Sequence, residues 1–262
     1  MKTKAFTLIE VMVVMAVISI LAGMMMPSVW RFWESEEIAT TRERMKELKK
    51  AMVGDRSLIQ NGVRTHYGFV GDFGELPFDN NSSCAFKFLN SNADMAASSR
   101  YNSANWSGRY LSSSDTSNYA VDAWGNPIRC TNKLYADNRW AGLTLTSVAP
   151  NGELIEEVID ANDVVPTNRV AGNVFAAYSG LVIDIKPEKT GSFTEINNMC
   201  KPLAPFSAYT TLLPYNLPIG RINVTLKLSK HTDCSSVAET TNFHYLIHDN
   251  IRYIKMPDIN AK

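Results

Sequence analysis

The chain begins with an apolar segment of membrane-spanning length. Hydrophobic side chains fill almost every position from Phe6 to Met26, a run of about 21 residues in which Glu10 is the one charged side chain. At ~1.5 Å per residue, a helix of this length crosses a hydrocarbon core of roughly 30 Å. The pattern therefore predicts a transmembrane helix over residues 6–26.

The pattern beyond Pro27 is that of an amphipathic helix. Charged residues crowd positions 34–50, and the apolar residues that follow helical spacing form one stripe: Met45, Leu48, Met52 and Ile59. A single helix is therefore expected from residue 6 to about residue 60, with the stripe of its second half packed on a globular head. Pro27 lacks a backbone N–H, which predicts a helix kink or a locally melted turn. Gly54 weakens the last turn by about 1 kcal/mol.

Turn and strand signals follow the helix. The segment from Gly62 to Pro77, with glycines at positions 68, 71 and 74, predicts a linker from the helix to a sheet. Gly125-Asn126-Pro127 is a turn signal, and residues 143–148 are a strand signal. Beyond Pro166, apolar and polar residues alternate over 222–228, and residues 181–185, 205–213 and 243–256 are further strand candidates separated by Pro and Gly. This last region is either a β-sandwich of its own or an extension of the sheet in the head.

Charge and cysteine content restrict the class of protein. The 262 residues carry 26 basic and 26 acidic side chains, a formal net charge of +0 that gives no support for nucleic-acid binding. Four cysteines lie beyond the apolar segment, where an oxidising compartment permits two disulfides. For a two-domain head, the favoured pairs are local, Cys84 with Cys130 and Cys200 with Cys234. Free thiols are the alternative, and the lack of Cys-x-x-Cys spacing disfavours a metal site.

The string Ala5-Phe6-Thr7-Leu8-Ile9-Glu10, followed by Pro27, resembles the N-terminus of type IV pilins and type II secretion pseudopilins. In that family a prepilin peptidase cuts before the phenylalanine and methylates the new amine. The resemblance implies a leader of residues 1–5 and a mature chain that begins at N-methylated Phe6. The family usually has glycine before the cut, and the small side chain of Ala5 is expected to fit there.

Glu10 has a physical reason to interrupt the apolar run. A carboxylate inside a membrane is costly and is usually retained for a partner. The resemblance implies that this partner is the amine of Phe6 on a neighbouring subunit, so that the charges cancel only when subunits stack in register. The alternative is that Glu10 lies at the interface of an ordinary membrane anchor.

The middle of the chain carries a second resemblance. A turn at residues 122–128, a strand at 143–147 and a loop ending in Asn162-Asp163 follow the order found in the heads of major type II pseudopilins. In those relatives the loop holds calcium, a cation that takes about six to eight oxygen ligands. The resemblance implies these ligand positions: Ser147, Asn151, Asn162 and Asp163, with Asp160 as an extra carboxylate. Asn151 and Asn162 stand where the family has aspartates, which lowers the negative charge of the loop. The alternative to a calcium site is an acidic loop held by its own hydrogen bonds.

These patterns predict an α+β protein of four segments. The first two are the leader 1–5 and the helix 6–60, whose part 6–26 is transmembrane. A pilin-like head with an antiparallel β-sheet follows over 61–165, and a β-rich domain, for which a sandwich is one form, covers 166–262. Lys2 and Lys4 favour a cytoplasmic N-terminus in a bacterial inner membrane, with the head in the periplasm or in an extracellular filament.

The favoured function is a structural one, that of a type II secretion pseudopilin assembling through its N-terminal helix to drive protein export. Its partners would be the membrane, the prepilin peptidase, an inner-membrane assembly platform and other pilin-like subunits or copies of itself. The alternatives are a minor type IV pilus subunit with an adhesive C-terminal domain and a binding module tethered by the helix. The sequence has no nucleophile elbow, phosphate loop or zinc-protease motif, so an enzyme is not expected.

Overall fold

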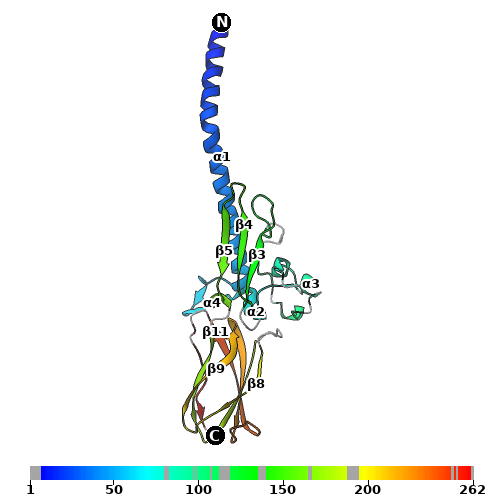
Figure 1. Cartoon of the computed structure of the whole chain (residues 1–262), viewed down its shortest axis with the longest axis vertical. Helices are drawn as coiled ribbons and strands as arrows, with labels where there is room; N and C mark the ends of the chain where they lie inside the picture. Colours follow the sequence, from blue (N-terminus) through cyan, green and yellow to red (C-terminus); the bar gives the residue numbers. More distant parts are fainter. Residues whose placement is uncertain are drawn as a thin grey trace.

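The computed structural model describes residues 7–79, 83–96, 98, 100–106, 108–111, 119–134, 140–164, 167–187, 195–248, 251 and 253–260. These residues form an α+β structure with three parts along its long axis (Figure 1). A long helix leads into a head that mixes helices and strands, and a β-rich domain lies at the end opposite the start of the helix.

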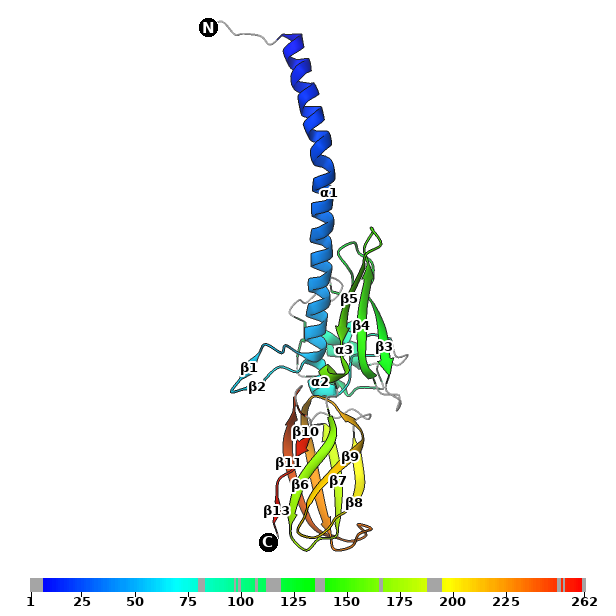
Figure 2. The same cartoon turned by 60° about the vertical axis from the view of Figure 1, so that its left-hand side comes forward.

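The long helix, α1 (Leu8–Val53), ends earlier than residue 60, the end expected from the sequence. Gly54 stops it with φ 83°, a conformation that side chains other than glycine rarely adopt, and its N–H donates to the Lys50 carbonyl at 2.7 Å. Ile59 therefore lies outside the helix and is 62% exposed, so its inclusion in the apolar stripe was wrong. The helix continues without a melted turn through Pro27, and its N-terminal half leans relative to the rest in Figure 2.

The head sheet is antiparallel, in the order β3 (Arg129–Leu134), β4 (Trp140–Val148) and β5 (Leu154–Ile159). Strand β5 lies beside the second half of α1 (Figure 2). Because successive side chains of a strand point to opposite faces of the sheet, Leu143 and Leu145 of β4 both lie in the core. The helix contributes its stripe to the same core: Ile38, Met45, Leu48 and Met52. The predicted packing of the stripe on the head is therefore confirmed for Met45, Leu48 and Met52.

Short elements complete the head: β1 (Ile59–Gln60), β2 (Val63–Arg64), α2 (Gly68–Phe73), η1 (Phe86–Leu89), α3 (Asn92–Met95), η2 (Ser103–Asn105) and α4 (Ala161–Val164). The glycine-rich segment predicted as a linker is helix α2, so that prediction was wrong. Phe69 and Phe73 of α2 are buried and stack with their ring centroids 4.5 Å apart. Gly74 ends this helix in a left-handed conformation, whereas the apolar residues between the glycines supply the core.

The C-terminal domain is a β-sandwich. One sheet has the order β11 (Val237–Ile247), β10 (Gly220–Ser229), β7 (Gly180–Pro187) and β8 (Ile196–Pro202), all antiparallel. The other pairs β6 (Thr167–Phe175) with β9 (Ala208–Leu217), and with β12 (Ile254–Lys255) and β13 (Ile259–Asn260) in parallel. Both sheets contribute to one core, separate from that of the head, so these strands do not extend the head sheet.

The turn between β9 and β10 joins the two domains. Ile219 in this turn is buried in the head core rather than in the sandwich core. Its N–H donates to the Val164 carbonyl at 2.8 Å, and Gly220 follows with φ 120°. Head and sandwich are therefore connected by packing and backbone hydrogen bonding as well as by the chain itself.

Candidate functional site

The first half of α1 presents a long, exposed apolar surface. Its large apolar side chains are exposed from Leu8 to Trp33, apart from Pro27 and Ser28, whose side chains are outside the description. Within the described residues, α1 is the one helix long and apolar enough to cross a membrane. In Figure 1 this half projects beyond the head. Such a surface needs lipid or other helices around it, because apolar area left in water costs about 25 cal/mol per Å².

Glu10 is held by Thr7 at the start of this surface. The Thr7 backbone N–H donates to Glu10 Oε2 at 2.9 Å, and the Thr7 hydroxyl donates to the same oxygen at 3.0 Å. In return, the Glu10 N–H donates to Thr7 Oγ1 at 3.4 Å. This reciprocal capping box satisfies donors that would otherwise be orphaned at the helix start. The sequence reasoning missed Thr7, although the Thr-x-x-Glu spacing is a recognised signal for it.

The predicted cleavage site lies outside the described residues, because the description begins after Ala5 and Phe6. The capping box therefore supplies the structural information nearest to that site. Thr7 would be the second residue of a chain cut before Phe6, and its hydroxyl and N–H both contact the Glu10 carboxylate. The cap therefore fixes the orientation of the Glu10 carboxylate relative to Thr7 at the start of α1.

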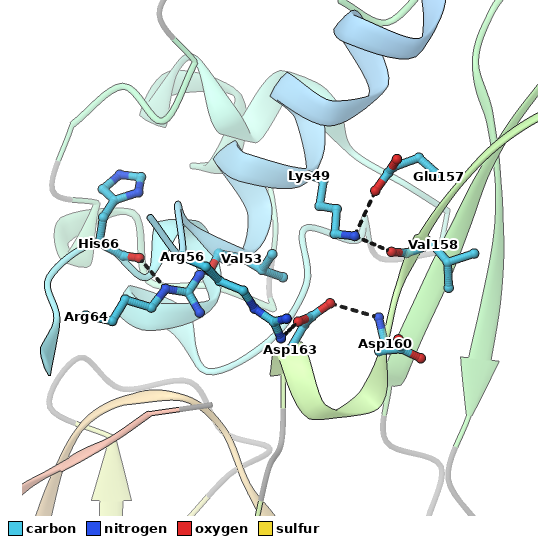
Figure 3. A network of polar contacts seen from close by, with 9 residues as sticks. All are labelled: Lys49, Val53, Arg56, Arg64, His66, Glu157, Val158, Asp160 and Asp163. Carbon is cyan, nitrogen blue, oxygen red and sulfur yellow. Dashed lines mark hydrogen bonds and ion pairs between the residues drawn. The ribbon is translucent and has the colours of Figure 1, made fainter. Parts of the chain in front are cut away.

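The second half of α1 is held along the head by polar contacts with β5 (Figure 3). Lys49 Nζ lies 2.7 Å from Glu157 Oε1 and donates to the Val158 carbonyl at 2.6 Å. Closer to the N-terminus of α1, Arg42 pairs with Glu153, the residue just before β5, at 2.8 Å. These pairs are partly exposed, and each is worth about 1 kcal/mol or less. They align strand and helix, while the buried stripe supplies most of the stabilisation.

The C-terminal end of α1 is held by two arginines (Figure 3). Buried Arg64 donates from Nη2 to the Val53 carbonyl and from Nε to the His66 carbonyl at 2.9 Å. A cation near the last carbonyls of a helix is favoured by the helix dipole. Arg56 forms an ion pair with the buried carboxylate of Asp163, which also accepts from the Asp160 N–H at 3.1 Å. The helix end, the β1–β2 hairpin and α4 are thus joined.

The turn around Asp122 packs against the second half of α1. The buried Asp122 carboxylate accepts from the backbone N–H groups of Trp124 at 3.0 Å and Asn126 at 2.7 Å. The hydroxyl of Ser147 donates to the same carboxylate at 2.7 Å. From the helix, Arg44 donates to the Asp122 carbonyl at 2.7 Å. The turn that resembled a pseudopilin segment therefore orients the sheet relative to the helix.

The five predicted calcium ligands are not brought together. Ser147 is opposite Ile155 in the β4–β5 register, whereas Asp160 follows the far end of β5. Five residues of strand at ~3.3 Å each separate the two places by roughly 16 Å, whereas calcium–oxygen distances are about 2.3–2.6 Å. Ser147 already donates to Asp122, and Asn151 Oδ1 accepts from the Glu153 N–H at 2.7 Å. This set does not fit a single calcium ion.

The two remaining predicted positions lie together in α4, just beyond the end of β5. Asn162 belongs to α4, and Asp163 beside it pairs with Arg56. The described residues contain no cluster of three or more His, Cys, Asp or Glu side chains with metal-binding geometry. Among the predicted ligands, the side chains of Ser147, Asn151 and Asp163 are instead engaged in contacts within the chain.

The cysteines form two local disulfides. Cys84 is bonded to Cys130 in the head, with a Cα–Cα distance of 6.5 Å. Cys200 is bonded to Cys234 in the sandwich, with a Cα–Cα distance of 6.0 Å. These are the two pairs favoured by the two-domain reading of the sequence. Each disulfide lies within one domain, so neither crosses the joint.

Comparison with protein families matches residues 1–26 to the prokaryotic N-terminal methylation motif. The match covers the predicted leader and the whole apolar segment, and it supports a type IV pilin-like prepilin N-terminus. Together with the single apolar helix, it supports anchoring by one membrane span. Comparison with curated proteins and with solved structures finds no match to the chain.

Proposed function

We propose that this chain is a filament subunit that assembles through the exposed half of α1, and that the filament belongs to a type II secretion system and drives protein export. The observation that carries the proposal is the methylation motif on a helix whose apolar side chains find no cover within their own chain from Leu8 to Met26. Lipid covers such a helix before assembly, and neighbouring helices cover it within a filament.

Maturation at the N-terminus is part of the proposal. Cleavage between Ala5 and Phe6 would remove the two leader lysines and create a positively charged amine near Glu10. A carboxylate in an apolar environment gains most from a charged partner, because the low dielectric strengthens the attraction. Pairing between Glu10 and the amine of Phe6 on a neighbouring subunit would then stabilise one axial register of subunits relative to others.

The choice of a secretion filament is supported by the segment from Asp122 to Asp163, whose order resembles major pseudopilin heads. The Asp122 turn contacts α1 through Arg44, which gives this segment a structural role that does not require calcium. The export function itself is inferred from this resemblance.

A pilus subunit with an adhesive tip domain is the second candidate. The sandwich has its own core and its own disulfide, and it lies at the end of the molecule farthest from the start of α1 (Figure 1). A domain in that position could present a binding surface beyond the body of a filament.

A deletion strain separates the two candidates. Loss of export with surface fibres retained is the expected result for a secretion subunit, and restoration by the wild-type chain is the control. Undisturbed export together with loss of fibres would favour the pilus. The intact mass and N-terminal sequence of the chain from its host membrane test processing directly. A start at N-methylated Phe6 is expected, whereas an uncut Met1 would favour a tethered binding module.

A further inference from the structure

Four consecutive residues of α1 form a collar just beyond the apolar run. Trp30, Phe32 and Trp33 are 64%, 64% and 55% exposed, and Arg31 between them is exposed as well. The rings of Trp30 and Trp33 meet edge to face with centroids 6.0 Å apart. We refer to residues 30–33 as the aromatic collar.

The collar surrounds the helix rather than marking one face. Successive helical residues are rotated by about 100°, so four residues in sequence point to all sides of one turn. Trp30 and Trp33 are three residues apart and share one face of α1. Phe32 and Arg31 point to other sides, so a partner helix, which touches only one side of α1, would not cover the whole collar. A ring of aromatic residues with one cation matches a surrounding medium instead.

The distance along the helix points to the same medium. From Leu8 to Met26 the apolar run is 19 residues, or about 28 Å, close to the roughly 30 Å of a hydrocarbon core. Trp30 lies about 6 Å and Trp33 about 10 Å further on, and helical side chains lean back toward the N-terminus. This depth is that of the lipid headgroups, where Trp is enriched and Arg extends its charge to water.

We infer that the aromatic collar is an interfacial anchor that binds the headgroup layer of the membrane surface facing the head, and so sets the depth of the subunit before assembly. The inference rests on the membrane anchoring in the proposed function, but it does not require a filament. Glu34, Glu36 and Glu37 follow the collar at once and resist further insertion, because charged side chains are costly in hydrocarbon. Ile38 then begins the buried stripe, so the head starts about one turn beyond the collar.

Depth-dependent quenching of tryptophan fluorescence tests this inference. The full chain is reconstituted into vesicles of phosphatidylcholine and phosphatidylglycerol that are brominated either near the headgroup or near the chain ends. The collar signal is the difference between the wild-type chain and Trp30→Phe/Trp33→Phe, since the other three tryptophans of the sequence lie outside α1. Shallow bromines are expected to quench this difference signal at least twofold more than deep ones.

Vesicle flotation distinguishes the possible failures. A chain that does not float with the vesicles overturns both the membrane anchoring and the collar. A chain that floats but is quenched equally or more by deep bromines overturns the collar alone. A floating chain quenched by neither lipid also overturns it, because a second copy of the helix would then cover these rings.

A labelling experiment gives an independent readout. Ser35→Cys, two residues beyond the collar, is labelled with a membrane-impermeant maleimide. In Trp30→Leu/Trp33→Leu the apolar run extends toward residue 33, draws residue 35 toward lipid and is expected to slow labelling at least threefold. Ser57→Cys, on the exposed part of the head, should react at the same rate in both backgrounds. An unchanged rate at residue 35 would count against the collar.

Discussion

Gly71 of α2 and Gly220 of β10 meet backbone to backbone at the joint between the head and the sandwich. A Cβ added at Gly220 would lie 2.7 Å from the Gly71 carbonyl oxygen and 3.0 Å from its Cα. Gly220 also has φ 120°, which is rare for residues with a side chain. The joint therefore depends on the absence of a side chain at this position.

Gly220→Ala is expected to lower the free energy of unfolding by roughly 2–4 kcal/mol, because backbone strain and steric overlap act together. Thermal unfolding of the full chain in detergent measures the loss. Gly152→Ala is the matched control, since Gly152 has φ 86° but no atom near the added Cβ, and it should cost only about 1 kcal/mol. Equal losses in the two variants would show that the contact with Gly71 contributes nothing.

Asp122→Ala is expected to destabilise the head by roughly 2–4 kcal/mol, because it removes a buried carboxylate from the Trp124 and Asn126 N–H groups. Asp122→Asn should cost less, since its carbonyl can still accept from both amides while the Ser147 hydroxyl turns to accept from the new NH₂ group. Urea denaturation gives both values. A similar loss for the two variants would mean that the charge, rather than the hydrogen bonds, stabilises the turn.

Tyr101 makes stability fall at high pH. Burial raises its pKa to about 12 from an ordinary value of 10.0, and its hydroxyl donates to the Leu76 carbonyl at 2.6 Å. The folded state therefore binds the phenolic proton more tightly than the unfolded state does. This stability, about 2–3 kcal/mol, is fully present below pH 10 and is lost as pH rises from about 10 to 12.

Tyr101→Phe tests this origin of the pH dependence. It should lower stability by roughly 1–2 kcal/mol at pH 8, because the Phe78 N–H and the Leu76 carbonyl lose their partner. It should also flatten the decline above pH 10. Unfolding free energies from urea denaturation at intervals between pH 8 and 11 measure both effects. If the free energy of unfolding of the variant fell as steeply above pH 10 as that of the wild-type chain, the pH dependence would come from groups other than Tyr101.

Each disulfide should stabilise its own domain. Replacing Cys200 and Cys234 with Ser is expected to cost the sandwich about 2–4 kcal/mol, because closing the intervening loop restricts the unfolded chain. The same change at Cys84 and Cys130 should act on the head. Hydrogen exchange on the intact chain resolves the two domains. Equal loss of protection in both domains from either variant would show that they unfold as one unit.

Glu10→Ala is expected to leave membrane insertion intact and to reduce filament assembly at least tenfold, since it removes the charge inside the apolar run. Glu10→Gln separates this charge from the cap, because a glutamine at this position retains an oxygen that can accept from the Thr7 N–H. Assembly should fail in both variants if charge pairing matters. Recovery with Gln would assign the role of Glu10 to capping its own helix. Filaments sheared from cells and quantified by immunoblotting provide the measurement.

Most features of helix α1 could be predicted from the sequence alone. The apolar run, the interruption by Glu10 and the stripe of Met45, Leu48 and Met52 are local patterns, and each is expressed within one helix. The Thr-x-x-Glu cap is equally local and could have been recognised. The favoured cysteine pairs followed from their order along the chain once two domains were assumed.

Other features depended on long-range packing. The segment with Gly68 and Gly71 became helix α2 because Phe69 and Phe73 pack into a core assembled from distant segments. Position-by-position resemblance grouped Ser147 with Asp160, whereas the strand register placed them at opposite ends of β5. Likewise, the residues of α1 that contact the Asp122 turn could be identified only once the sheet was placed against the helix.

Periodicity along the chain was therefore enough to predict the membrane-length helix, its amphipathic continuation and the alternating strands, because each depends on a pattern within one segment. Tertiary structure decided that the last strands form a separate sandwich, that the predicted calcium ligands lie apart, and that Gly71 meets Gly220. These outcomes depend on which segments share a core and in what register, and register is set by contacts between residues far apart in the chain.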